Sequence, residues 1–114
     1  MLNLTPHPIT IQIDGREPVT LPPFGMVARV ETTERAAGAV TVNDAGVMGN
    51  VPVIRREMGA VTGLPDNDTL LVLVSSIVLA ALPGRPNTFA PDTGPTAIRD
   101  EKGHIVAVTR LVAA

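Results

Sequence analysis

The stretch LLVLVSSIVLAALPG, residues 70–84, decides the fold that we predict for this chain. Its first part, residues 70–74, is apolar without alternation, which is typical of a central strand buried on both faces. Either Ser75 or Ser76 can then cap a short helix, which the closing proline and glycine must end. We therefore predict a buried central strand followed directly by one short helix.

Short strands are predicted on both sides of this stretch. Residues 9–13 alternate between isoleucine and polar residues, which is the period of a half-buried strand. Asp14-Gly15 is a signal for a type I′ hairpin turn, after which the chain returns through residues 19–21. Further strands are expected at residues 26–33, 51–57, 96–99 and 104–111, the last two forming a terminal hairpin.

Two segments between these strands combine small or polar residues with glycine or proline. Residues 33–50 contain three glycines and predict either a loose hairpin or a mobile loop. Residues 85–95 contain three prolines and predict an extended loop that the prolines stiffen. Neither segment carries the signals of a second domain, so we expect one domain over residues 1–114.

The predicted elements add up to a mainly β (α+β) domain of seven or eight short strands and one helix. We expect a small closed or nearly closed barrel, because closure removes exposed strand edges. A two-layer sheet with one covering helix is the alternative.

The composition excludes several kinds of site. With 9 basic and 11 acidic residues and only two aromatic ones, the chain offers neither a basic surface nor stacking platforms for nucleic acid. It has no cysteine and only two histidines, so we expect no disulfide, no metal site and no cofactor. Because no signal peptide and no apolar run of roughly 18 residues is found, we expect a cytoplasmic protein that does not enter a membrane.

Four motifs spread over nearly the whole chain carry a resemblance to a known family. They are NLTPH at 3–7, GAVTGLP at 59–65, VSS at 74–76 and RPNTFAPDTGPTAIRDEKGHIVAV at 85–108. With them the chain resembles a small protein family encoded by tailed bacteriophages, prophages and bacteria. The resemblance implies a phage or prophage accessory protein, in the host cytoplasm if phage-encoded, and it implies no mechanism. It favours two roles, a part of a particle or a binder that disarms host defences.

The serine pair at the start of the predicted helix is one candidate site. Free amide groups at a helix N-terminus favour an anion such as phosphate or carboxylate. Ser75 and Ser76 would form this site, and the guanidinium groups of Arg85 and Arg99 could complete it. Because the stretch lacks the glycines of a phosphate loop, the alternative is that a serine only caps its own helix.

His7 is a second candidate, because it lies between two prolines that would hold its imidazole in one place. With Asn3, Thr5 and Asp92 it could form a polar pocket. A hydrolytic arrangement of His7 with Ser75 is disfavoured, because the GxSxG motif that would support it is absent. The alternative is a histidine on the surface before a strand.

Two further positions could contact a ligand. Asp92 and Thr93 lie in the stiff proline-rich segment, where they could either present polar groups or close a turn before Gly94. Arg29 lies in a predicted strand, where it could pair with Glu57 or become a ligand arginine if that face lines a barrel mouth or a subunit interface.

These candidates support two functions. The first is binding of a small anionic, nucleotide-like ligand, for example a host-defence signal. The second is a structural or assembly component of a phage particle that self-associates without a ligand. An enzyme is the less expected class. We predict a homo-oligomer, because a chain with 45% apolar and 18% charged residues in many short strands should expose apolar surface.

Overall fold

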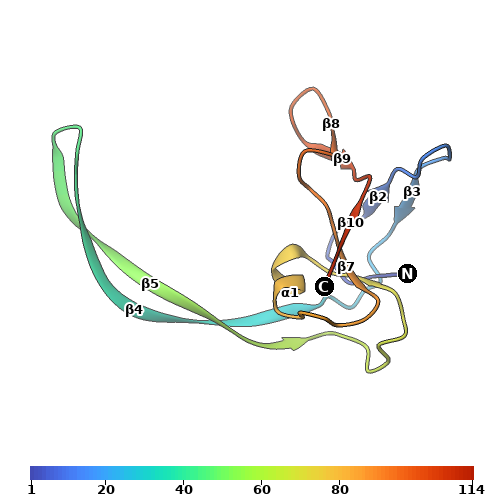
Figure 1. Ribbon diagram of the computed structural model, residues 1–114, viewed down its shortest axis with the longest axis horizontal. Helices are drawn as coiled ribbons and strands as arrows, with labels where there is room; N and C mark the ends of the chain where they lie inside the picture. Colours follow the sequence, from blue (N-terminus) through green and yellow to red (C-terminus); the bar gives the residue numbers. More distant parts are fainter. The chain divides into compact units, whose positions relative to one another are not determined.

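The computed structural model describes residues 1–114, and the chain divides into two units (Figure 1). The first unit joins Met1–Val30 to Val61–Ala114, and the second is Glu31–Ala60. We call them the sheet unit and the hairpin unit. The buried hydrophobic cluster belongs to the sheet unit alone.

The sheet unit is built around a four-stranded sheet with the order β1-β6-β7-β10. Strands β1 (Leu2–Asn3), β6 (Val72–Leu73) and β7 (Thr88–Pro91) pair in parallel, and β10 (Leu111–Ala113) pairs antiparallel with β7. The fold is therefore mainly β, as predicted. The strand order describes an open sheet with β1 and β10 at its edges, so closure into a barrel stays a prediction.

Two small hairpins complete the sheet unit. One joins β2 (Ile9–Ile11) to β3 (Val19–Leu21), and the other joins β8 (Ile98–Arg99) to β9 (Ile105–Ala107). A parallel bridge between Ile11 and Val108 ties the two hairpins together. Both hairpins were expected, but residues 111–113 leave the terminal hairpin and become β10 of the main sheet.

The predicted central strand and helix are confirmed. Val72 and Val74 are fully buried, and α1 (Ser76–Ala80) follows at once. Ser75 is the N-cap of this helix, and its Oγ accepts a hydrogen bond from the amide of Val78 at 3.4 Å. The strand is shorter than the predicted residues 70–74, since β6 contains only Val72 and Leu73. Leu70 and Leu71, which precede it, are exposed.

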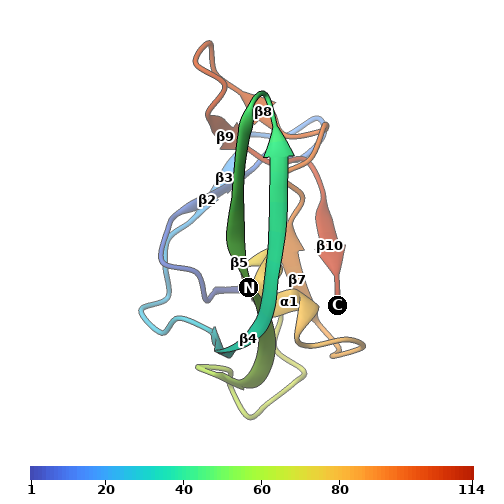
Figure 2. The ribbon, with the colours of Figure 1, turned by 90° about the vertical axis from the view of Figure 1, so that its left-hand side faces the viewer.

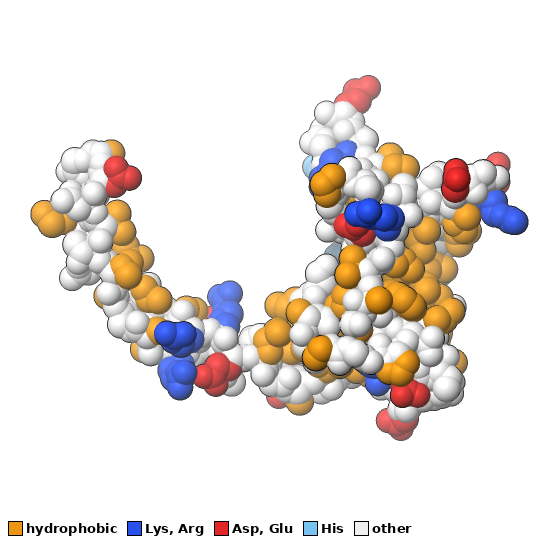
Figure 3. Space-filling view, in the orientation of Figure 1, with side chains coloured by type: hydrophobic (Ala, Val, Ile, Leu, Met, Phe, Trp, Pro, Cys, Tyr) orange, Lys and Arg blue, Asp and Glu red, His pale blue; other side chains and the backbone are white.

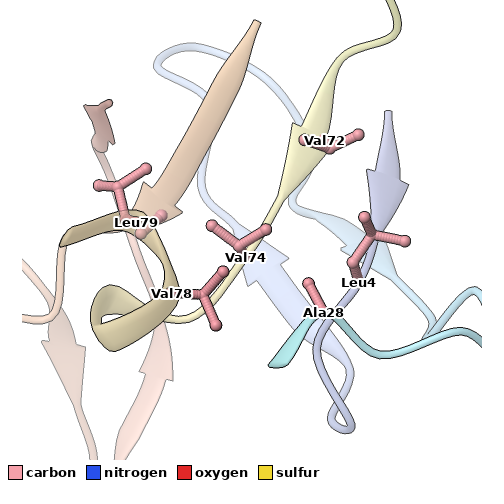
Figure 4. Packing of buried hydrophobic residues seen from close by; sticks show 7 residues of the cluster. Leu4, Ala28, Val72, Val74, Val78 and Leu79 are labelled. Carbon is pink, nitrogen blue, oxygen red and sulfur yellow. The ribbon is translucent and has the colours of Figure 1, made fainter. Parts of the chain in front are cut away.

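The core forms where α1 packs against the sheet (Figure 4). Its buried members come from β6, α1, β7 and the segments after β1, after β6 and before β4, and are Leu4, Ala28, Val72, Val74, Val78, Leu79 and Ala90. Gly63 lies beside this core with a φ of +81°, and a Cβ there would overlap the carbonyl of Val27. Glycine is therefore required at this position by both conformation and space.

Two local expectations were wrong. Residues 85–95 were expected to be a loop but contain β7, in which Thr88 and Ala90 are buried while Phe89 and Pro91 are half-buried. The prolines of this segment concealed that alternation. The turn at Asp14-Gly15 is not type I′, because only Gly15 of the two has a positive φ (+70°).

The hairpin unit, Glu31–Ala60, contains nearly all of one long two-stranded sheet. Strands β4 (Arg29–Asp44) and β5 (Val47–Thr62) have 16 residues each and run side by side to the turn (Figure 2). Residues 33–50 are thus a hairpin rather than a loop. The primed turn lies here, at Ala45-Gly46, where φ is +52° and +79°. Every residue of the hairpin unit is exposed except Val53, which is half-buried.

No helix of the protein has the length and apolar character needed to cross a membrane.

Candidate functional site

The structure brings three of the predicted site residues together, namely Asn3, Thr5 and His7. The Asn3 side chain is buried, and its Nδ2 donates to the carbonyls of His7 at 2.8 Å and Leu21 at 2.9 Å. Its Oδ1 accepts from the amide of Thr5 at 3.1 Å and from the Thr5 hydroxyl at 2.6 Å. Asn3 and Thr5 therefore hold the backbone beneath the exposed His7, and their own polar atoms are used internally.

A pocket of about 350 Å³ lies beside His7, between the first and last hairpins of the sheet unit. Hydrogen bonds from Gln12 N to Val108 O and from Val108 N to Thr10 O, both 2.9 Å, hold the walls together. The lining is largely apolar and consists of His7, Pro8, Ile9, Thr10, Pro91, Thr93, Ile105, Val106, Ala107 and Val108. Two predicted site residues, His7 and Thr93, thus face the same pocket, whose size is at the lower end for small-molecule sites.

Asp92 does not line this pocket, although it lies between two residues that do. Its Oδ1 accepts from the amide of Gly94 at 2.9 Å, and its Oδ2 accepts from Arg110 Nε at 2.9 Å and Nη2 at 2.6 Å. The amide of Gly94 and then the Arg110 guanidinium hold the pKa of Asp92 below its usual range. Asp92 therefore closes a turn and ties β7 to the segment before β10.

The groups of the predicted anion site are engaged in other contacts. Ser75 caps α1, a helix of only five residues, and Ser76 lies in a shallow apolar groove between α1 and β10. Arg85 Nη2 donates to the carbonyl of Pro65 at 3.1 Å, while its Nε is buried without a partner. Arg99 donates to the carbonyls of Gly103 at 2.9 Å and of Thr93 at 3.2 Å. No hydrogen bond joins either arginine to the serines.

Arg29 is exposed at the start of β4 and does not pair with Glu57. Glu57 instead pairs with Arg35 at 2.9 Å, and Arg56 pairs with Glu34 at 3.1 Å. Both pairs lie on the hairpin, which the sequence did not indicate as a candidate site.

The hairpin exposes large apolar side chains along much of its length (Figure 3). The most exposed are Val47 and Met48 beside the turn, at 69% and 71%. All the exposed large apolar residues of the hairpin are Val40, Val42, Val47, Met48, Val51, Ile54 and Met58. A hairpin with two exposed faces and so many apolar residues is the most unusual surface of the chain.

The two faces of the hairpin differ in composition. The hydroxyl of Thr41 and the Oδ1 of Asn50 are 2.8 Å apart, so these side chains share one face. Successive residues of a strand point to opposite faces, so the neighbouring valines lie on the other one. We call that surface the valine face, formed by Val40, Val42, Val47, Val51 and Val53.

Charged residues stand at both ends of the valine face. The alternation of the strands places Asp44 on it at the turn and Arg55 on it at the far end. Both side chains are exposed, and neither takes part in a salt bridge or side-chain hydrogen bond within the chain. They are therefore free to pair with a group from another molecule.

Comparison with known proteins gives no match to a family, to a curated protein or to a solved structure.

Proposed function

We propose that the protein is a structural component that self-assembles, and that its β4–β5 hairpin docks onto further copies of the chain. The observation that carries this proposal is the hairpin unit, which exposes valine, isoleucine and methionine on two faces and has no core of its own. An isolated two-stranded hairpin is at best marginally stable in water. Docking on another copy would supply the missing packing layer.

The resemblance to proteins of tailed phages and prophages fits an assembly role, since such a component would form part of a particle. The predicted closure of the strands into a barrel belongs to the same proposal, because closure would give the edge strands β1 and β10 partners. A structure of the assembled protein would test both points.

Sedimentation velocity of the full chain over a range of concentrations tests the proposal. We expect a mass that is a multiple of 11.9 kDa at micromolar concentration. The double variant Val42→Thr/Val51→Thr keeps β-branched side chains in the hairpin but adds hydroxyls to its apolar surface, so it should sediment mainly as a monomer. The matched control is Val19→Thr, which changes an equally exposed valine in the sheet unit and should sediment like the wild type. A wild-type protein that stays monomeric would contradict the proposal.

A second candidate function is binding of a small ligand, and the pocket beside His7 supports it. A ligand with a small apolar body would contact Ile9 and Val108, and an anionic group on it would contact the imidazole of His7 or the hydroxyl of Thr93. A thermal-shift screen with nucleotides and phosphorylated metabolites tests this, because a ligand at 100 times its Kd stabilises by about 2.7 kcal/mol. The His7→Gln variant should lose the shift, and a panel without any shift would remove this candidate.

A further inference from the structure

We infer that two copies of the chain pair through their valine faces in an antiparallel, twofold-symmetric arrangement, in which Asp44 of each copy lies opposite Arg55 of the other. This inference rests on the proposed self-association and specifies its geometry. It follows from the positions of two unpaired charges, Asp44 and Arg55, at the two ends of the valine face.

The two charges are equally far from the middle of the valine face. The contact between Thr41 and Asn50 places their neighbours Val40 and Val51 at the same level of the hairpin. Asp44 lies four residues from Val40 toward the turn, and Arg55 lies four residues from Val51 in the opposite direction. At about 3.3 Å per residue, each charge is about 13 Å from that level.

Because Asp44 and Arg55 lie at equal distances on opposite sides of this level, two copies related by a twofold axis can pair both charges at once. A twofold axis through the level of Val40 and Val51 brings the turn end of one hairpin over the far end of the other. Asp44 of each copy then faces Arg55 of the other, and the valines between them face each other. A parallel arrangement would instead oppose Asp44 to Asp44 and Arg55 to Arg55, which like-charge repulsion disfavours.

The other charged residues near the valine face do not compete for these two. Arg35, which lies near Arg55, already pairs with Glu57 of its own chain at 2.9 Å. On the opposite face Arg56 pairs with Glu34 at 3.1 Å. The hairpin thus neutralises four of its charges in internal pairs. Asp44 and Arg55 are the unpaired acid and base that flank the valine face, whereas Glu31, which is also unpaired, lies beside Gly59, four residues beyond Arg55 and outside that face.

The size of the contact predicts its strength. The paired region extends over about eight residues of each strand, or about 26 Å, and is only two strands wide. Such a contact is smaller than a standard interface. We therefore expect a dimer that dissociates on dilution, with the face of Met48, Ile54 and Met58 left for a further contact.

Charge exchange tests the arrangement. The variants Asp44→Arg and Arg55→Asp each place like charges at both ends of the contact, so each should self-associate about tenfold more weakly than the wild type. An equimolar mixture of the two restores both opposite-charge pairs and should associate as the wild type does. The double variant Asp44→Arg/Arg55→Asp should also regain self-association. Sedimentation equilibrium with one variant fluorescently labelled measures each case.

Asp14→Arg and Arg16→Asp are the controls, because they make the same changes of charge at an exposed turn of the sheet unit and should leave association unchanged. If the single variants associate normally, or if mixing them restores nothing, the antiparallel pairing is overturned. Self-association itself would still stand if Val42→Thr/Val51→Thr separated the copies. A monomeric wild type would remove both proposals together.

Discussion

The sheet unit and the hairpin unit contain similar strands in very different surroundings. In the sheet unit, Val72 and Leu73 of the short strand β6 are fully buried. In the hairpin unit, Val40 and Val51 belong to strands of 16 residues and remain about half exposed. The difference shows that hydrogen-bonded pairing alone does not bury a side chain. Burial needs a second layer, and the hairpin has none within its own unit.

This contrast has a thermodynamic consequence. Removal of apolar surface from water contributes about 25 cal/mol per Å², so the sheet unit is stabilised by its cluster while the hairpin gains little. The hairpin therefore opens more easily than the sheet unit unless another molecule covers it. The following predictions test that contrast, from the largest expected effect to the smallest.

The largest effect is expected from Leu4→Ala, because Leu4 is fully buried in the core. The loss of its side chain leaves a cavity and should lower the free energy of unfolding by about 2–5 kcal/mol. The matched change in the hairpin is Met48→Ala, which removes a 71% exposed side chain and should stay within about 0.5 kcal/mol. Urea unfolding followed by circular dichroism measures both. Equal effects would show that the hairpin has a packed core after all.

Arg85→Ala should have the next largest effect, because Arg85 connects two loops of the sheet unit through its bond to the carbonyl of Pro65. We expect the free energy of unfolding to fall by about 1.5–3 kcal/mol, the range of a single hydrogen bond to a charged group. Arg85→Lys should recover part of it, since lysine keeps the charge but not the planar fork. If instead Arg85→Ala left the melting temperature unchanged and abolished binding of an anion, the anion site predicted from the sequence would be supported.

Residues 70–84 could be predicted because their signals are local. An unbroken apolar run, a serine and a Pro-Gly pair each act within a few residues, so the buried strand, the cap and the end of α1 followed from the sequence. The hairpin could not be predicted in full. Its strands continue through Gly38 and Gly49, which are typical of loops, and a glycine with φ of +85° inside a strand is the conformation of a β-bulge.

Strand β7 and the pocket depend on distant contacts, and this is why they were missed. Thr88 and Ala90 are buried because β7 lies between β6 and β10 in the sheet and packs against α1, and none of these neighbours is visible from the local sequence. Of the predicted site residues, Asn3, Thr5 and His7 do lie together, because they are close in the chain. Thr93 reaches the same pocket only through the fold, and the apolar wall from residues 105–108 had no chemical signal at all.

Protonation of Asp92 in acid should destabilise the sheet unit. We expect this effect to be smaller than that of Arg85→Ala. The pKa of Asp92 is lowered in the folded protein by the amide of Gly94 and by Arg110. The stabilisation is therefore fully present above the ordinary carboxyl pKa of about 4 and is lost as the pH falls through the lower, folded pKa. Asp92→Asn should be less stable than the wild type at pH 7, and the difference should shrink below pH 4. A difference that is constant with pH would contradict this role.

The smallest effect is expected at the turn of the hairpin, from Ala45→Asn. Ala45 has a φ of +52°, a conformation that alanine adopts at a cost and that asparagine tolerates well. Asn-Gly is also the preferred pair for a type I′ turn, so the variant should stabilise the hairpin by about 0.5–1 kcal/mol.

The method that can detect this added stability depends on whether the hairpin opens separately from the sheet unit. If the hairpin opens independently of the core, it is already open when urea unfolds the sheet unit. Urea unfolding of the sheet unit will then not detect the effect of Ala45→Asn. Amide hydrogen exchange of residues 40–51 should slow by about two- to fivefold, since exchange there reports local opening. Exchange of Val72 and Val74 should stay unchanged and serves as the internal control. If Ala45→Asn slowed exchange in both units equally, the hairpin and the sheet would open as one cooperative body, and the contrast between them would not hold.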